Sequence, residues 1–186
     1  MEQALARRSE VEDQIRELLP EWSLAGLVDA LQSLHGVALI IAVSIVAEVG
    51  DLKRFENPKQ LMAFLGLVPG EYSSGNKVRP RGITKMDNIG VRRLLYEAAW
   101  SYRQTPKVGA YKRKHVPKDI SQIAKDIAWK AQQRLCKRYR KLVARGKKSQ
   151  VAIMAVAREL LGFMWAIAHS LKNPTVAQGP TASKMA

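Results

Sequence analysis

The sequence contains little of the chemistry that metal-dependent or disulfide-bonded proteins use. Cys136 is the single cysteine among 186 residues, so an internal disulfide is excluded and a reducing compartment is favoured. The three histidines, His35, His115 and His169, are far apart along the chain, and the acidic residues around positions 65–95 stand singly. Metal sites need clustered ligands. We therefore expect no metal site built by this chain.

Long apolar runs are also lacking. The most apolar run, residues 37–47, is much shorter than the roughly 20 residues of a membrane-spanning helix, and the run 151–168 is interrupted by Arg158 and Glu159. No positively charged leader precedes an apolar run at the N-terminus. We expect two core helices here, no export signal, no membrane partner and a cytoplasmic protein.

Two common catalytic motifs are missing as well. There is no G-x-x-x-x-G-K-[ST] loop for nucleotide phosphates and no G-x-S-x-G strand-turn-helix that would expose a hydrolase serine. Catalytic triads assemble in space, so spacing alone does not exclude one. The missing motifs leave nucleotide hydrolysis unsupported and argue against a hydrolase of the nucleophile-elbow type.

Positive charge is abundant and unevenly distributed. The net charge is +15 and the isoelectric point is near 10.2. Residues 1–76 hold 6 basic and 11 acidic residues, whereas residues 101–150 hold 16 and 2. A solvated helix face usually mixes charges of both signs, so the second segment favours nucleic acid as a partner.

Apolar spacing predicts a mainly α fold, a helical bundle with one long functional loop. The predicted helices are residues 2–19, 24–34, 37–49, 58–65, 88–102, 120–144 and 150–171. No strand-like alternation of any length is present, so the fold is expected to be mostly or wholly helical. We divide the chain into an amphipathic helix (1–20), one domain (21–172) and a disordered tail (173–186).

Gly36 lies in a tight turn between two of these helices. A helix-hairpin-helix-like turn offers backbone N–H groups to a phosphate, which makes Gly36 a candidate nucleic-acid-binding residue. The second small position is Ala38 instead of glycine, and an ordinary turn explains Gly36 equally well.

Residues 69–82 are predicted to form an exposed loop, because glycine and proline interrupt every period there. The loop contains Ser73 and Ser74, which are also common turn residues. Cations surround the serines in sequence, and a phosphate is the natural guest of such a cluster. The candidate phosphate-binding residues are Arg79, Arg81, Lys85, Arg92 and Arg93.

Two further basic segments follow. Residues 104–117 are predicted to form a loop or short broken helix, and residues 120–144 a long helix with one apolar stripe containing Ile123, Ala124, Ala131 and Leu135. The candidate nucleic-acid-binding residues are Lys112, Arg113, Lys114, Arg134, Lys137 and Arg138.

Several of these motifs occur together in one known family. The runs GLVP at 66–69, SSG at 73–75, RGITK at 81–85 and RRLL at 92–95, with Asn88 between the last two, resemble the C-terminal domain of insertion-sequence transposases related to pilin-gene invertases. These are RNA-guided recombinases that combine a serine with a DEDD metal site. The resemblance spans roughly residues 31–167.

The resemblance implies a function in DNA transposition and recombination. It assigns Ser74 as the nucleophile that attacks a DNA phosphodiester, with Ser73 as the alternative if the register differs by one, and adds Asn88 to the phosphate contacts. It implies DNA and guide RNA as partners, a homo-oligomer or full-length transposase as assembly partner, and a nucleoid-associated location. It also implies Mg²⁺ bound by a RuvC-like domain.

Two departures from the family pattern affect this reading. Asp87 stands where relatives have glycine, and the RuvC-like half is absent from the sequence, so we expect a fragment or truncated copy that binds better than it cuts. Three hypotheses remain: a recombinase domain using Ser74, a non-catalytic nucleic-acid-binding remnant or regulator, and a junction binder without a nucleophile. Whether the chain acts as an enzyme is left open.

Overall fold

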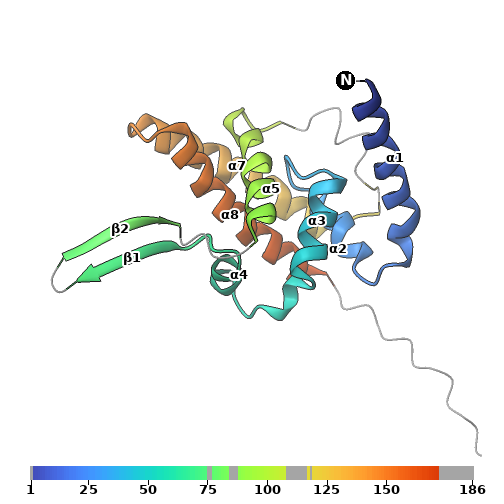
Figure 1. Ribbon diagram of the computed structural model, residues 1–186, viewed down its shortest axis with the longest axis horizontal. Coiled ribbons are helices and arrows are strands. Elements are labelled where there is room, and N and C mark those ends of the chain that lie inside the picture. Colours follow the sequence, from blue (N-terminus) through green and yellow to red (C-terminus); the bar gives the residue numbers. More distant parts are fainter. Residues whose placement is uncertain (1, 75–76, 84–87, 108–116, 118, 172–186) are drawn as a thin grey trace, which may run out of the picture.

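This computed structural model describes residues 2–74, 77–83, 88–107, 117 and 119–171, with only the backbone course given for 69–74 and 77–83. Helices make up most of the described part of the chain (Figure 1). The helices confirm the prediction of a mainly α bundle. In chain order the elements are α1 (Glu2–Leu18), η1 (Leu19–Glu21), α2 (Ala25–Leu31), α3 (Leu39–Val49), η2 (Leu52–Arg54), α4 (Pro58–Phe64), β1 (Pro69–Ser74), β2 (Lys77–Ile83), α5 (Ile89–Trp100), η3 (Ser101–Arg103), α7 (Gln122–Ala144) and α8 (Ser149–Ser170).

Helix α8 is the central element of the bundle. It packs against α7, α5, α4 and α2, and its inner side chains, such as Ile153, Leu160 and Ile167, are fully buried. By length and composition alone α8 could cross a membrane, and it is the one such helix in the described residues; half of that apolar stretch is buried inside the fold. Burial among four helices explains its apolar character as that of a core helix.

The helix ends follow the local sequence signals. The Asn57 side chain accepts a hydrogen bond from the Gln60 backbone N–H at 3.0 Å, and Pro58 occupies the first helical position of α4. Gly50 ends α3 with φ of 74°, and Gly146 follows α7 with φ of 76°. Glycine adopts this left-handed conformation without steric cost, so both helices stop where predicted.

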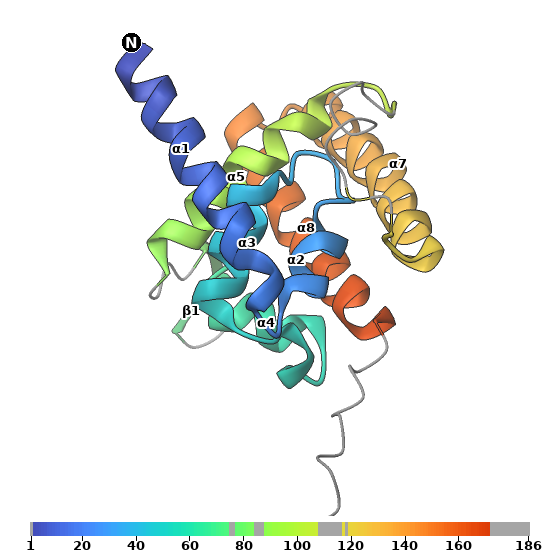
Figure 2. The ribbon, with the colours of Figure 1, turned by 90° about the vertical axis from the view of Figure 1, so that its right-hand side faces the viewer.

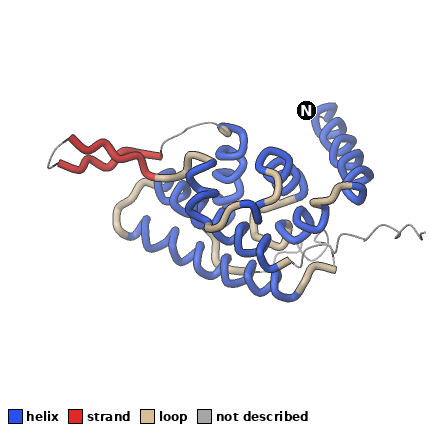
Figure 3. The backbone as a smooth tube through the Cα atoms, turned by 90° about the horizontal axis from the view of Figure 1, so that it is seen from below, coloured by secondary structure: helices blue, strands red, loops and turns tan. Residues whose placement is uncertain are grey.

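A β-hairpin replaces the predicted loop. Strands β1 and β2 pair antiparallel and extend away from the helical body (Figures 1 and 3). The prediction that residues 69–82 contain no strand is therefore wrong. The reason lies in the two residues between the strands: Gly75-Asn76, which lie outside the described residues, form a dipeptide typical of two-residue hairpin connections.

The turn between α2 and α3 packs closely against the end of α5. Gly36 has φ of 81°, and a Cβ added there would meet the Ala98 carbonyl oxygen and the Ser101 hydroxyl oxygen. Packing inside the fold therefore requires glycine at this position. The helix-hairpin-helix interpretation of the turn, and a nucleic-acid contact by Gly36, stay predictions.

Two long-range hydrogen bonds tie η2 and the residue after it to the end of α8. Trp165 Nε1 donates to the Phe55 carbonyl oxygen at 2.8 Å, and Lys53 Nζ donates to the Leu171 carbonyl oxygen at 2.9 Å. Helix α4 then packs on α8 and leads into the hairpin. The hairpin therefore follows directly after α4, which packs against the core helix α8.

Helix α1 lies on the outside of the bundle, and Figure 2 shows it extending beyond the other helices. Its last residue, Leu18, is 66% exposed, and Val11 is 44% exposed. The apolar stripe predicted for residues 2–19 is therefore only partly used for packing in this chain.

Candidate nucleic-acid interface

The register of the hairpin separates the two candidate serines. Ser74 lies opposite Lys77, Ser73 opposite Val78, and Tyr72 opposite Arg79. Cross-strand partners share a face of a sheet, and successive positions alternate between faces. By register, the Ser74 position therefore shares a face with those of Lys77 and Arg79. The Ser73 position shares the other face with that of Val78.

The register shifts at the base of the hairpin. Pro69 pairs with Ile83 and Glu71 pairs with Pro80, so β2 holds one more residue than β1 between these pairs. Arg81 lies in this irregular segment. Bulges of this kind increase local twist and redirect the chain. Lys85 and Asp87, farther along, lie outside the described residues.

Asn88 connects the hairpin region to helix α5. It precedes the first residue of α5 and has φ of 51°, a left-handed conformation that asparagine adopts more readily than most residues. The prediction that a helix begins at this point is confirmed. A phosphate contact by Asn88 stays a prediction.

The two neighbouring arginines of α5 have different environments. Arg92 is buried, with 8% of the residue exposed, and its Nη1 donates to the Leu65 carbonyl oxygen at 3.3 Å. The Arg93 side chain is 80% exposed and pairs with Glu97 at 3.0 Å. Arg92 turns inward because Leu65, at the end of α4, offers a buried carbonyl oxygen to it. Arg93 alone is open to a phosphate from solvent. A phosphate contact by either arginine stays a prediction.

A carboxylate of α8 holds two of the predicted cations of α7. Glu159 lies 3.1 Å from Arg134 Nε and 3.0 Å from Arg138 Nε. The first contact is a hydrogen-bonded ion pair, and the second is an ion pair only. These pairs link α7 to α8 and reduce the positive charge that the two arginines present to a ligand.

Most of the other cations between 130 and 148 have no acidic partner among the described residues. Asp126, which accepts a hydrogen bond from Gln122 at 2.8 Å, is the single carboxylate of α7. The cations without an ion pair in this part of the structure are Lys130, Lys137, Arg140, Lys141, Arg145, Lys147 and Lys148. Six of these lie between 137 and 148, so the C-terminal half of α7 and the turn after it present concentrated positive charge.

The buried side of α7 differs in part from the predicted stripe. Ala124, Ala131 and Leu135 are buried as predicted, but Ile123 is 59% exposed. Cys136 joins the core instead, as its small apolar side chain allows. Lys112, Arg113 and Lys114 lie outside the described residues, so their predicted role stays a prediction.

Neither of the buried reactive side chains is placed for nucleophilic chemistry. Burial raises the pKa of the Cys136 thiol, with a smaller lowering effect from Arg140, so the thiol is kept protonated. Burial raises the pKa of Tyr102 well above its ordinary range, and its hydroxyl has no hydrogen-bond partner among the residues that the structure describes. Both groups belong to the core.

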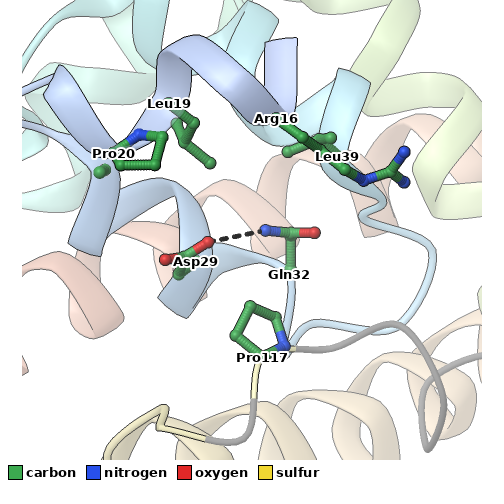
Figure 4. Close-up of a pocket in the computed structure, with 8 residues that line it drawn as sticks. Arg16, Leu19, Pro20, Asp29, Gln32, Leu39 and Pro117 are labelled. Atoms are coloured by element: carbon green, nitrogen blue, oxygen red, sulfur yellow. Dashed lines mark hydrogen bonds between the residues drawn. The ribbon is translucent and has the colours of Figure 1, made fainter. Parts of the chain in front are cut away.

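A pocket of about 270 Å³ lies between α1, α2 and Pro117 (Figure 4). Asp29 and Gln32 form a hydrogen bond of 3.2 Å in it, and burial raises the pKa of Asp29 while that bond lowers it. Figure 1 places α1 and α2 at the end of the body away from the hairpin. The pocket was not predicted and is remote from the candidate serines.

The described residues contain no cluster of three or more histidine, cysteine, aspartate or glutamate side chains that could hold a metal ion.

Comparisons with known proteins identify the kind of protein that this chain resembles. Residues 28–113 match the model of the Transposase IS116/IS110/IS902 family. The chain is 53% identical over 171 residues to "Putative transposase y4qE" of Sinorhizobium fredii, covering 92% of this chain and 44% of that relative. It is 46% identical over 69 residues to the transposase for insertion sequence element IS1111A of Coxiella burnetii, which is 37% of this chain and 19% of the relative.

A third relative is the transposase for insertion sequence element IS1328 of Yersinia enterocolitica, 32% identical over 95 residues, or 51% of this chain and 28% of the relative. The chain thus spans less than half the length of each of these relatives. Residues 28–113 are therefore similar to the IS116/IS110/IS902 transposase family, and the chain is similar to a transposase over most of its length.

Proposed function

We propose that this chain is the DNA-binding part of an insertion-sequence transposase that acts in DNA transposition. The observation that carries the proposal is the 53% identity, over 92% of the chain, to a protein named as a transposase. The charge distribution supports it: exposed cations that have no acidic partner among the described residues gather on the C-terminal half of α7 and in the turn after it. Such a surface binds the phosphate backbone of nucleic acid.

We further propose that Ser74 is the nucleophile. The register of the hairpin supports Ser74 over Ser73, because the cross-strand partner of Ser74 is Lys77 and the partner of Ser73 is Val78. A phosphate that a serine attacks gains negative charge in the transition state, and nearby cations stabilise that charge. Lys77 and Arg79, which share the face of Ser74 by register, are the cations proposed for this role.

The proposed step is a phosphoryl transfer. The Ser74 hydroxyl oxygen bonds to the phosphorus of a DNA phosphodiester, and the bond from phosphorus to one deoxyribose oxygen breaks. The serine proton passes to a base, and the departing oxygen takes up a proton. A serine–phosphate ester retains the energy of the broken link for later strand joining. A serine hydroxyl needs activation for this attack.

That activation is proposed to come from a partner. Since the described residues hold no cluster of three or more metal-ligating side chains, we assign the activating acids and their Mg²⁺ to a RuvC-like domain outside residues 1–186. A longer form of the protein, a full-length transposase or a homo-oligomer would supply that domain. We also propose guide RNA as a partner. Without such a domain, residues 1–186 are expected to bind nucleic acid and not to cut it.

One experiment separates the recombinase from the alternative of a non-catalytic remnant or regulator. The chain is mixed with a purified RuvC-like domain of a related transposase, Mg²⁺, guide RNA and labelled target DNA, and denaturing gels are searched for a covalent protein–DNA adduct. An adduct on this chain supports the recombinase. Tight DNA binding without an adduct, in a mixture where a full-length transposase gives one, favours the remnant.

A further inference from the structure

Residues at every fourth position of α7 form an inclined ridge that turns about 40° around the helix at each step, and its members from Trp129 onward are exposed. We call this set the outer ridge. It consists of Lys125, Trp129, Gln133, Lys137, Lys141 and Arg145, the last being the residue that follows α7. Four residues of α-helix rise about 6 Å, so the outer ridge is about 30 Å long. It contains four cations and no carboxylate.

Trp129 is the unusual member of the outer ridge. It is 40% exposed, although tryptophan is largely buried in most proteins. Trp165 donates to a backbone carbonyl and stacks on His169, and Trp100 lies against Tyr96 and Arg103. Among the described residues, Trp129 has no ring contact, cation–π contact or hydrogen bond of this kind. Its ring is therefore open to a ligand.

The members of the outer ridge suit different parts of one ligand. An exposed indole provides a flat apolar surface on which a nucleobase stacks, and this interaction tolerates any base because every base has a π face. Gln133, one turn farther along, carries both a donor and an acceptor for base edges. Lys137 and Lys141 follow at the same spacing and attract phosphates.

We propose that the outer ridge binds a single strand of nucleic acid, with an unpaired base stacked on Trp129 and the backbone following Lys137, Lys141 and Arg145. A duplex keeps the faces of its bases inside the stack, so it reaches the cations but not the indole face. The inference rests on the proposed nucleic-acid binding of this helix and adds the class of partner.

The test compares Trp129→Ala with Trp129→Phe in the full chain. Affinity is measured by fluorescence anisotropy for single-stranded DNA and single-stranded RNA of about 12 nucleotides and for the matching DNA duplex. Trp129→Ala is expected to weaken binding of at least one single strand about tenfold and to change duplex binding less than about twofold. Trp129→Phe keeps an aromatic face and is expected to retain most of the affinity. The strand type that responds identifies the source as DNA or RNA.

Ile123→Ala is the matched control, because Ile123 is an exposed apolar residue of α7 outside the outer ridge. It is expected to leave all affinities unchanged. Equal loss for single strand and duplex in Trp129→Ala, or no loss for either single strand, overturns the proposal. Equal weakening by Ile123→Ala and Trp129→Ala also overturns it, since general loss of apolar surface then explains the result.

Variants of the ridge cations distinguish failure of the stacking proposal from failure of the proposed nucleic-acid binding. Lys137→Gln with Lys141→Gln is expected to weaken binding of single strand and duplex alike. If that double variant binds every nucleic acid as well as the parent does, nucleic-acid binding by α7 itself is wrong. If it weakens all binding while Trp129→Ala changes nothing, only the stacking inference fails.

Discussion

Ser74 and Lys77 are cross-strand partners on either side of the Gly75-Asn76 connection, whereas Ser73 lies opposite Val78. Because successive residues of a strand lie on opposite faces of the sheet, a shift of one position moves a residue to the other face. The two adjacent serines therefore occupy positions on opposite faces of the hairpin, although their sequence surroundings are nearly the same. Replacing each serine separately can therefore test which one is the nucleophile.

Replacing Gly36 is expected to destabilise the fold. In Gly36→Ala, a Cβ would enter the space of the Ala98 carbonyl oxygen and would force alanine into φ of 81°, which we expect to cost at least about 2 kcal/mol. Gly26→Ala is the control, because Gly26 lies in α2 with nothing within 4 Å of an added Cβ. That change is expected to stabilise by about 0.5–1 kcal/mol. Urea unfolding measures both. Equal stability of the two variants would contradict the packing role of Gly36.

Arg92 and Arg93 are expected to differ although they are neighbours. Arg92→Met removes the donor to the Leu65 carbonyl oxygen inside the fold, so we expect a loss of about 1–3 kcal/mol in the free energy of unfolding. Arg93→Ala removes an exposed ion pair with Glu97 and is expected to change stability by less than about 0.5 kcal/mol. Thermal and urea unfolding of the pair provide the test. A destabilised Arg93→Ala beside an unaffected Arg92→Met would reverse the assignment.

Removing the Tyr102 hydroxyl is expected to leave stability unchanged or to increase it by about 1 kcal/mol, because this buried group has no hydrogen-bond partner in the described part of the chain. Burial raises the Tyr102 pKa above its ordinary value of 10.0, so the unfolded chain releases this proton first as the pH rises. Stability of the parent should therefore fall above about pH 10, and Tyr102→Phe should fall less. Unfolding measured from pH 8 to 11 checks this. A strongly destabilised Tyr102→Phe would show that the hydroxyl has a partner in solution.

Binding to duplex DNA is expected to weaken steeply with salt. Each phosphate contact contributes about −0.9 to the slope of log K against log salt concentration, so Lys137→Gln should reduce the steepness by about one contact. Lys59→Gln, at an exposed position of α4 away from α7, is the charge-matched control and should change the slope less. A salt series by anisotropy measures all three proteins. A flat slope in the parent would exclude phosphate binding as the basis of its affinity.

Much of the helical architecture could be predicted from local sequence, because the signals are local. Asn57-Pro58 begins α4, and Gly50 and Gly146 end α3 and α7, each through capping or backbone conformation within a few residues. The basic character of α7 follows from composition alone. The hairpin was predictable in part from Gly75-Asn76, but glycine and proline elsewhere in the segment obscured the two short strands.

The remaining features depend on distant residues. Arg92 turns inward because the Leu65 carbonyl, 27 positions earlier, is available to it. Glu159 reaches Arg134 and Arg138 across the α7–α8 contact, so the charge of two predicted nucleic-acid-binding cations is partly neutralised. Periodicity describes one helix at a time and contains no information on such pairs. The exposure of Ile123 has the same origin, since it depends on which face of α7 meets α8.

The most direct test of the account is the identity of the serine that becomes linked to DNA. Ser74→Ala and Ser73→Ala are compared with the parent in the reconstituted reaction, and the adduct is quantified on denaturing gels and mapped by mass spectrometry. Ser74→Ala is expected to abolish the adduct while DNA binding stays nearly intact, because the hydroxyl reacts and does not hold the DNA. Ser73→Ala is expected to retain the adduct. An adduct that persists in Ser74→Ala and disappears in Ser73→Ala would contradict the assignment drawn from the hairpin register, and an adduct retained in both variants would reject the serine mechanism.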